Sequence, residues 1–206
     1  MSISTKKRAA ILQHLSKDKQ LKPLLLDLEI QWPVARKDVY FELLRAITGQ
    51  QLSIKAADTI WNRTLLLFKD QYPTARELIK LDIEKLRSAG LSYQKAGYLQ
   101  NIARFHHTYG ITYDTLQTMD NEAIISLLTQ IKGVGRWTVE MLLMFSLQRL
   151  DVFPIDDLGV RQGMIKLYKV TLHGKEQRTL LHHIAQCWQP YASIACRYLW
   201  QYKDVK

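Results

Sequence analysis

Apolar residues recur at helical spacing along most of the chain. The stretch Ser92–Tyr109 places Ala96, Leu99, Ile102 and Ala103 on one face of a helix. Similar spacing recurs in other stretches, often behind a residue that caps helix N-termini. Further helices are predicted after Thr74, which forms a capping box with Glu77, and after Asp82. The remaining predicted helices cover residues 39–48 after Asp38, Ser53 to Phe68, Asp120 to Gln130, 136–147, 158–169, 175–188 and 191–202. Short β-branched patches are too isolated to form a sheet. We therefore predict an all-α protein of about ten helices, folded as a single domain over residues 1–206.

A glycine-rich turn joins two of these predicted helices. Residues 131–138 read Ile-Lys-Gly-Val-Gly-Arg-Trp-Thr, and Gly133 and Gly135 let the backbone turn tightly and approach a neighbour closely. The first amides of the following helix lack intrahelical partners, so they form a site for an anion such as a nucleic-acid phosphate. This pattern indicates a helix-hairpin-helix. An ordinary turn between helices, capped by glycine, has the same pattern, and the turn alone does not separate the two.

Two adjacent carboxylates favour the first interpretation. Asp157 lies 22 residues after Gly135, next to Asp156, where a proline loop meets an apolar helix. Helix capping explains one of the two aspartates. A second carboxylate close to a phosphate-binding turn is costly unless it has a task, so we predict a catalytic role for one of them.

Composition and charge agree with a nucleic-acid partner. The 206 residues are 47% hydrophobic, enough to bury a core, and 29 Lys and Arg against 19 Asp and Glu give a net charge of +10. No uncharged run is long enough to span a membrane, and Met1–Ala10 lacks the features of a secretory signal, so we expect neither membrane association nor export. Cys187 and Cys196 lie in apolar helical contexts, and we expect both to be buried, reduced thiols. Two cysteines cannot ligate an iron–sulfur cluster alone.

Four motifs occur in the order and with the spacing of a known family. They are residues 45–53, 133–138, 151–159 and 188–191, and together they span roughly residues 35–200. The chain resembles the helix-hairpin-helix DNA glycosylases with a Gly/Pro-Asp loop, and within them the 3-methyladenine DNA glycosylase II type. The resemblance implies two helical lobes around an active cleft, with both chain ends in one lobe. It also implies a compact form without the N-terminal sheet domain of larger relatives.

The resemblance assigns the chemistry to particular residues. Asp157 falls on the catalytic position, where a carboxylate stabilises an oxocarbenium-like transition state and orients water; Asp156 is then a loop or cap residue. Trp137 stands where base-plus-lyase members carry a lysine nucleophile, which implies a monofunctional enzyme that leaves an abasic site. Trp137 and Tyr191, with Tyr40 as a weaker candidate, are expected to form an aromatic pocket for a cationic alkylated base. Core packing is the alternative for all three.

The resemblance also implies the contacts with DNA. The residues expected at the DNA are Gly133, Val134, Gly135, Arg136 and Thr138 of the hairpin, and Gln51, Leu52 and Ser53 of a loop that enters the minor groove. Whether Gln51 or Leu52 fills the gap in the duplex stays open. The backbone carbonyls of Thr129, Ile131 and Val134 are expected to bind a monovalent cation, and no other cofactor is required.

These expectations combine into one predicted function. We expect the protein to flip alkylated purines of the 3-methyladenine and 7-methylguanine type out of double-stranded DNA and to hydrolyse their glycosidic bond. We expect it to act as a monomer, in the cytoplasm or nucleoid of a bacterium or in the nucleus of a eukaryote. Two alternatives stay open: a non-catalytic helix-hairpin-helix module, which the presence of Asp157 disfavours, and a glycosylase for uracil, a deaminated purine or ethenoadenine.

Overall fold

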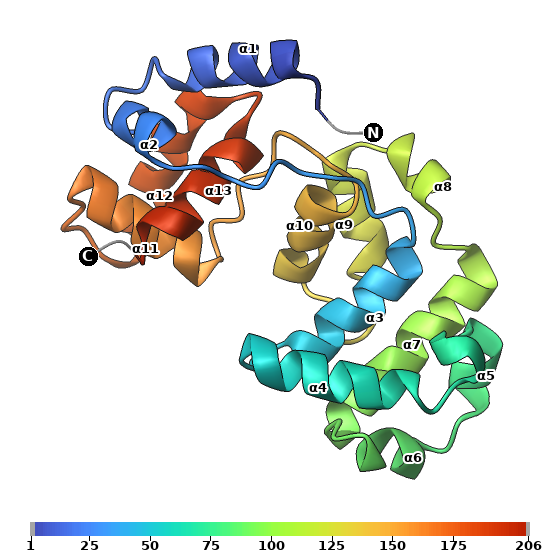
Figure 1. Ribbon diagram of the computed structural model, residues 1–206. Helices are drawn as coiled ribbons and strands as arrows, with labels where there is room; N and C mark the ends of the chain where they lie inside the picture. Colours follow the sequence, from blue (N-terminus) through green and yellow to red (C-terminus); the bar gives the residue numbers. More distant parts are fainter. Residues whose placement is uncertain (1–2, 205–206) are drawn as a thin grey trace. The chain divides into compact units, whose positions relative to one another are not determined.

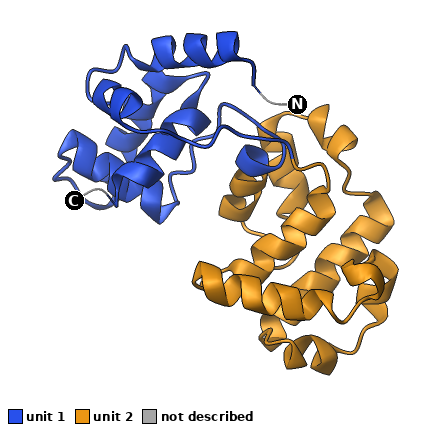
Figure 2. Cartoon of the chain, viewed as in Figure 1, with its two compact units in different colours: residues 1–35, 143–206 blue, residues 36–142 orange. Residues whose placement is uncertain are grey.

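A computed structural model describes residues 3–204 of the chain. Over that range it contains thirteen α-helices and two short 3-10 helices and no strand, which confirms the predicted all-α class (Figure 1). The chain divides into two compact units: unit 1 comprises residues up to 35 and from 143 onward, and unit 2 comprises residues 36–142 (Figure 2). Both terminal segments thus belong to unit 1. None of the described helices is long and apolar enough to cross a bilayer.

Unit 2 is built around the 17-residue helix α7 (Tyr93–Tyr109). Helix α7 packs against α3 (Val39–Gly49), α5 (Ala75–Lys80) and α6 (Ile83–Ser88), and α3 also packs against α4 (Ile54–Leu65). The remaining helices of this unit are η1 (Lys69–Gln71), α8 (Tyr113–Gln117), α9 (Asn121–Leu128) and α10 (Arg136–Phe145), whose last turn lies in unit 1. The apolar faces predicted for α3 and α7 are fully buried at Leu43, Leu44, Ile47, Leu99 and Ile102.

Side-chain caps explain where these helices begin. Asp38, Ser53, Thr74, Asp82 and Asp120 each accept a hydrogen bond from an amide in the first turn of the helix that follows, as predicted. The predicted end of α4 was wrong, because the helix stops at Leu65 and the chain continues as a turn to Phe68.

Unit 1 consists of α1 (Thr5–Leu15), α2 (Lys22–Asp27), α11 (Leu158–Tyr168), α12 (Gly174–Ala185), η2 (Gln186–Trp188) and α13 (Ala192–Tyr202). Helices α11 and α13 cross closely at Gly163, where an added Cβ would lie 2.7 Å from the carbonyl oxygen of Leu199. Helices α1 and α2 were not predicted. Helix α1 buries Ile11 and Leu15 among mostly polar neighbours and so lacks an apolar stripe.

A hydrogen-bonded carboxylate anchors the loop between α1 and α2 to the rest of unit 1. Asp18 accepts hydrogen bonds from the Tyr168 hydroxyl at 2.5 Å and the Trp188 indole at 2.9 Å, and from the amides of Gln20 and Leu21. Burial alone would raise the pKa of Asp18, but these donors outweigh it and the pKa is lowered.

The two cysteines differ in their surroundings. Cys196 is buried as expected, but Cys187 is exposed, so the prediction of two buried thiols was wrong for Cys187. Cys187 lies in η2, where neighbouring side chains point in different directions, and it is Trp188 that points into the core. Partial burial, with the nearby charge of Asp18, raises the pKa of the Cys187 thiol to about 11, so it stays protonated at neutral pH.

We expect Asp18→Ala to lower the free energy of unfolding at pH 7 by about 2 kcal/mol, because the buried indole of Trp188 loses its acceptor. The native pKa lies below the usual 3.8, so this stabilisation is present above about pH 4 and is lost as the pH falls through the native value. Urea unfolding at several pH values measures it. A difference between the two proteins that persists unchanged into strong acid would contradict the account.

Candidate functional site

The hairpin of unit 2 joins α9 to α10 through residues 129–135. Ile131 and Val134 are buried, and the Val134 amide donates to the Ile131 carbonyl at 2.9 Å. Gly133 has φ of +105°, and a Cβ on it would overlap the ring of Tyr98 in α7. The first hairpin glycine is therefore required by the protein's own packing.

The second hairpin glycine has a different environment. Gly135 is exposed, and a Cβ added to it would meet no protein atom within 4 Å. The packing of the protein therefore does not explain a glycine here. Open space beside the start of α10, where amides lack helical partners, suits the close approach of an anion.

Arg136 holds the hairpin together. Its guanidinium forms a two-point ion pair with Glu122 of α9, at 2.5 and 3.0 Å, and its Nε donates to Glu140 of α10 at 3.0 Å. The hydrogen bond with Glu122 is the main reason why the pKa of Arg136 is raised. The structure thus gives the predicted DNA contact Arg136 two carboxylate partners within the protein, which join α9 to α10.

The loop after α3 presents the predicted minor-groove residues. Gln51 is exposed with φ of 58°, and Leu52 is 39% exposed although it is apolar. Ser53 is also exposed, but its hydroxyl accepts from the Ala56 amide as the cap of α4. Gln51 and Leu52 are thus the side chains that this loop offers to a ligand.

Two side chains that were not predicted brace this loop. Lys95 of α7 donates to the carbonyls of Thr48 at 2.9 Å and Gln50 at 2.6 Å, and its burial lowers the pKa of its ammonium group. Gln50 in turn donates to the Thr138 hydroxyl of α10 at 3.0 Å. Thr138 is 3% exposed, and its hydroxyl connects the loop to the hairpin, while the contact with DNA that was expected of this residue stays a prediction.

Asp157 of unit 1 is a buried helix cap. It is 9% exposed, and its Oδ1 accepts from the Val160 amide at 2.8 Å and from the Trp200 indole at 2.7 Å. Asp156 is exposed and forms an ion pair with Arg178 at 2.6 Å. Of the two roles expected for Asp156, loop or cap, the structure shows the loop, since α11 begins at Leu158 and Asp157 is its cap.

The three predicted aromatic residues lie in unlike environments. Trp137, in the first turn of α10, is 39% exposed. Tyr191 is half-buried in unit 1 and packs edge-on against His14 at 5.4 Å. Tyr40 is 2% exposed, donates to the Pro73 carbonyl and stacks on His106 at 4.3 Å. For Tyr40 the structure favours core packing, the alternative noted above.

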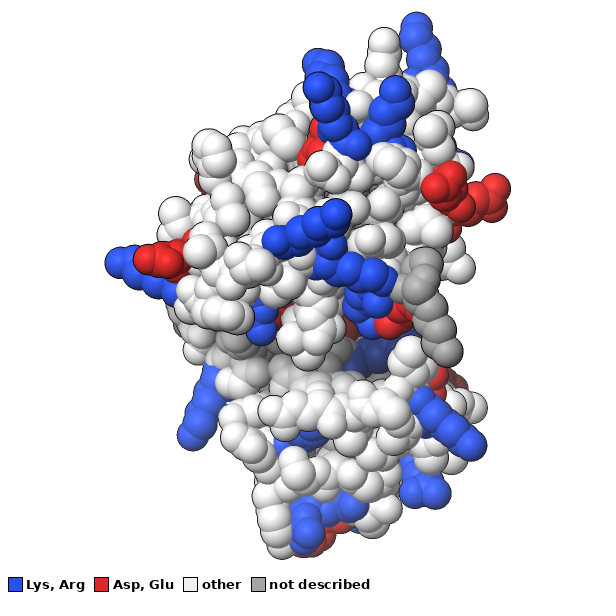
Figure 3. All heavy atoms as spheres, turned by 90° about the vertical axis from the view of Figure 1, so that its left-hand side faces the viewer, with Lys and Arg blue, Asp and Glu red and all other residues white. Residues whose placement is uncertain are grey.

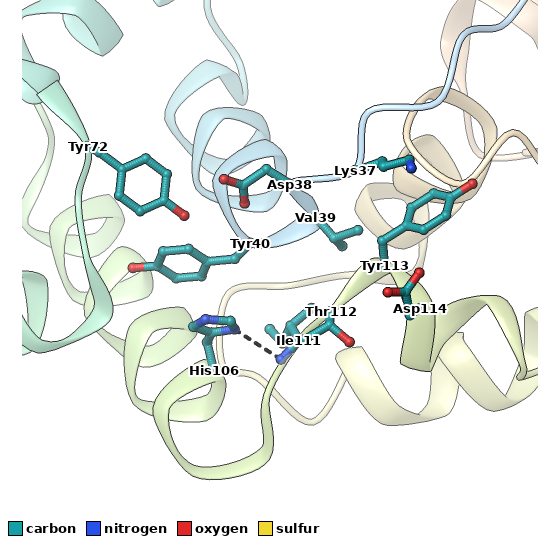
Figure 4. A pocket seen from close by; sticks show the side chains of 10 residues that line it. All are labelled: Lys37, Asp38, Val39, Tyr40, Tyr72, His106, Ile111, Thr112, Tyr113 and Asp114. Carbon is teal, nitrogen blue, oxygen red and sulfur yellow. Dashed lines mark hydrogen bonds between the residues drawn. The ribbon is translucent and has the colours of Figure 1, made fainter. Parts of the chain in front are cut away.

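Unit 2 also holds a separate pocket of about 340 Å³ that contains Tyr40 (Figure 4). Tyr72, Asp38 and His106 line it too, and His106 Nδ1 accepts from the Ile111 amide. Burial lowers the pKa of His106 and raises the pKa values of both tyrosines, so the rings are neutral at pH 7. Tyr40 is the one predicted site residue among those that line this pocket.

The last two features are the distribution of surface charge and the side chains that could bind a metal. On the face shown in Figure 3, Lys and Arg side chains are spread between uncharged stretches, with fewer acidic residues among them. Within residues 3–204, no group of three or more His, Cys, Asp or Glu side chains could hold a metal ion. The monovalent cation expected at the carbonyls of Thr129, Ile131 and Val134 stays a prediction; one of these carbonyls, that of Ile131, already accepts the Val134 amide.

Comparison with known proteins then places the chain. Residues 44–190 match the family described as HhH-GPD superfamily base excision DNA repair protein. The chain belongs to this superfamily. The DNA-3-methyladenine glycosylase 1 of Schizosaccharomyces pombe is 40% identical to this chain over 168 residues, which cover 81% of this chain and 73% of the relative.

Solved structures of superfamily members agree with the fold. The S. pombe 3-methyladenine DNA glycosylase in complex with abasic DNA superposes with a TM-score of 0.81 at 36% identity, over 93% of this chain and 95% of that one. The DNA-3-methyladenine glycosidase from Bacillus halodurans gives a TM-score of 0.85 at 31% identity, over 100% of this chain and 93% of the other.

The two hairpin glycines generate a paired prediction. Gly133→Ala should destabilise the protein by about 3 kcal/mol, because it combines a strained backbone with a clash against Tyr98. Gly135→Ala should leave the melting temperature unchanged but weaken binding to duplex DNA by about tenfold, through loss of close phosphate approach. Thermal melts and fluorescence anisotropy measure both effects. Unchanged DNA binding by a folded Gly135→Ala protein would remove this turn from the interface.

Proposed function

We propose that this protein is a monofunctional DNA glycosylase that excises alkylated purines from duplex DNA and leaves an abasic site. One observation carries the proposal: a buried, doubly hydrogen-bonded carboxylate, Asp157, at the catalytic motif position of a superfamily chain that is 40% identical to a DNA-3-methyladenine glycosylase. In this proposal the protein acts as a monomer, in the nucleoid or the nucleus.

The proposed reaction is hydrolysis at the sugar. Once the damaged nucleotide has been flipped out of the duplex, the bond between C1′ and the base nitrogen breaks, and C1′ develops oxocarbenium character. The carboxylate of Asp157 stabilises this positive charge and orients the water whose oxygen forms the new bond to C1′. The cationic base leaves as a neutral purine, and the proton lost by the water passes to the carboxylate or to solvent.

Aromatic side chains supply the preference for alkylated bases in this proposal. Alkylation on a ring nitrogen makes the purine cationic, and a cation near the face of an aromatic ring gains about 0.5–2 kcal/mol. Trp137 is the main candidate, since an indole that is 39% exposed at a motif position is accessible to a ligand. Tyr191 is the second. The burial of Tyr40 leaves it out of this role.

The proposed DNA contacts use backbone amides more than side-chain charge. Arg136 is paired with two carboxylates, so the amides beside Gly135 are the groups we assign to phosphate. Gln51 or Leu52 fills the gap left by the flipped nucleotide. Support for DNA as the partner comes from the S. pombe relative, which was solved with abasic DNA, and from the net charge of +10.

A monovalent cation at the hairpin is part of the proposal. The carbonyls of Thr129, Ile131 and Val134 would hold it, and its charge would favour a phosphate beside the turn. No other cofactor is needed for the hydrolysis proposed.

We expect Asp157→Asn to slow base release from methylated duplex DNA by about 10²- to 10⁴-fold, because the amide carries no charge to stabilise the sugar cation. Affinity for abasic DNA should be unchanged or higher. Asp156→Asn is the matched control: it removes an exposed ion pair with Arg178 and should excise at nearly the wild-type rate. If Asp156→Asn were the inactive variant, the assignment within this pair would be reversed.

The absence of a lysine at position 137 predicts the product. The wild-type protein should leave the DNA strand intact at each abasic site, and borohydride should trap no covalent adduct, since Trp137 cannot form an imine. Gel analysis before and after alkali treatment tests this. Efficient trapping by borohydride would show a lyase and overturn the monofunctional proposal.

A further inference from the structure

The carboxylate of Asp157 is held from two separate helices. The Val160 amide belongs to the first turn of α11, and the Trp200 indole belongs to α13, 43 residues further along the chain. Both N–H groups donate to the same oxygen, Oδ1, at 2.8 and 2.7 Å. Two donors in different directions restrict the rotation of a carboxylate and stabilise its negative charge.

The indole itself is held in place. Trp200 stacks on Phe145 with ring centroids 5.5 Å apart and an angle of 21° between the planes. The guanidinium of Arg197 lies 4.6 Å from the centre of the Phe145 ring and donates to the carbonyls of Gln31 and Met144. The donor therefore reaches Asp157 from a ring whose position is fixed by its neighbours.

A glycine makes room for this contact. A Cβ on Gly159 would lie 2.8 Å from Cδ1 of the Trp200 ring, which is closer than real Cβ contacts allow. Gly159 is the second residue of α11 and two positions after Asp157. The glycine two positions after Asp157 thus leaves the space that the Trp200 indole needs in order to reach the carboxylate.

We propose that Trp200 is a positioning residue for catalysis. Its indole N–H holds the Asp157 carboxylate in the side-chain orientation in which the carboxylate stabilises the sugar cation. The inference rests on the proposed function, because it takes Asp157 as the catalytic carboxylate. Trp200 does not touch the reacting atoms in this role; it acts through Asp157.

The chain offers a matched control. Trp188 of the same unit also donates its indole N–H to an aspartate, Asp18, at 2.9 Å, but that aspartate anchors the N-terminal loop. Trp200→Phe and Trp188→Phe remove the same kind of bond and keep a ring. They differ in which carboxylate loses its donor.

The experiment measures single-turnover release of methylated purines, affinity for duplex DNA with a tetrahydrofuran abasic analogue, and melting temperature. We expect Trp200→Phe to lower the release rate by roughly 10- to 100-fold, the range for loss of a hydrogen bond to a charged group, with affinity changed less than about twofold. Trp188→Phe should lower the melting temperature and excise at nearly the wild-type rate. Wild-type excision by a folded Trp200→Phe protein would overturn the inference.

A double variant separates positioning from general damage to the fold. If Trp200 acts through Asp157, adding Trp200→Phe to Asp157→Asn should cause little further loss of rate. An equal loss in both backgrounds would mean that Trp200 acts independently of Asp157. Should Trp200→Phe fail to fold, Gly159→Ala decides, since it displaces the indole and keeps its N–H: a wild-type release rate would overturn the inference.

The outcomes also distinguish this inference from the function beneath it. No base release by the wild-type protein, or full activity of Asp157→Asn, would mean that the proposed function has failed. Active wild type, inactive Asp157→Asn and fully active Trp200→Phe would mean that the inference alone has failed.

Discussion

Two N–H donors on Oδ1 of Asp157 are the interaction on which the candidate catalytic group depends. A carboxylate that is 9% exposed is costly unless donors compensate for lost water, and here an amide of its own helix and the indole of α13 do so. The close approach of α11 and α13, which Gly159 and Gly163 allow, is what brings the second donor within reach. In the proposed function one side chain therefore serves both as the cap of α11 and as the catalytic group, because the two N–H donors that hold it also orient its carboxylate.

In unit 2, side chains from several helices hold the backbone of the loop after α3 and of the hairpin in place. The loop after α3 and the hairpin are connected by Gln50 and Thr138, and Lys95 holds the loop carbonyls from α7. Arg136 closes the hairpin against Glu122 and Glu140. The charged groups of Arg136 and Lys95 are therefore bonded within the protein. In the proposed function, unit 2 contacts DNA through the backbone amides beside Gly135 and through the exposed loop residues Gln51 and Leu52.

Local signals explain what could be predicted from the sequence. Helix starts at Asp38, Ser53 and Asp120 were predicted because a cap depends on residues within one turn. Asp157 was singled out by the family resemblance, which places the catalytic aspartate at this distance from Gly135, and the structure shows that Asp157, and not Asp156, caps α11.

Partners far apart in the chain explain what could not be predicted. The bonds from Trp200 to Asp157 and from Lys95 to Thr48 join residues separated by more than forty positions, and no periodicity encodes them. For the same reason the bond from Gln50 to the Thr138 hydroxyl could not be predicted, since these residues are brought together only by the fold. The burial of Tyr40 against His106 likewise depends on how α3 meets α7.

The most direct test of the central claim is to incubate the wild-type protein with methylated duplex DNA and to identify the released bases by chromatography. We expect free 3-methyladenine and 7-methylguanine, with one alkali-labile abasic site for each base released. Binding to the DNA without release of any base, or release confined to uracil or deaminated purines from DNA that carries them, would contradict it.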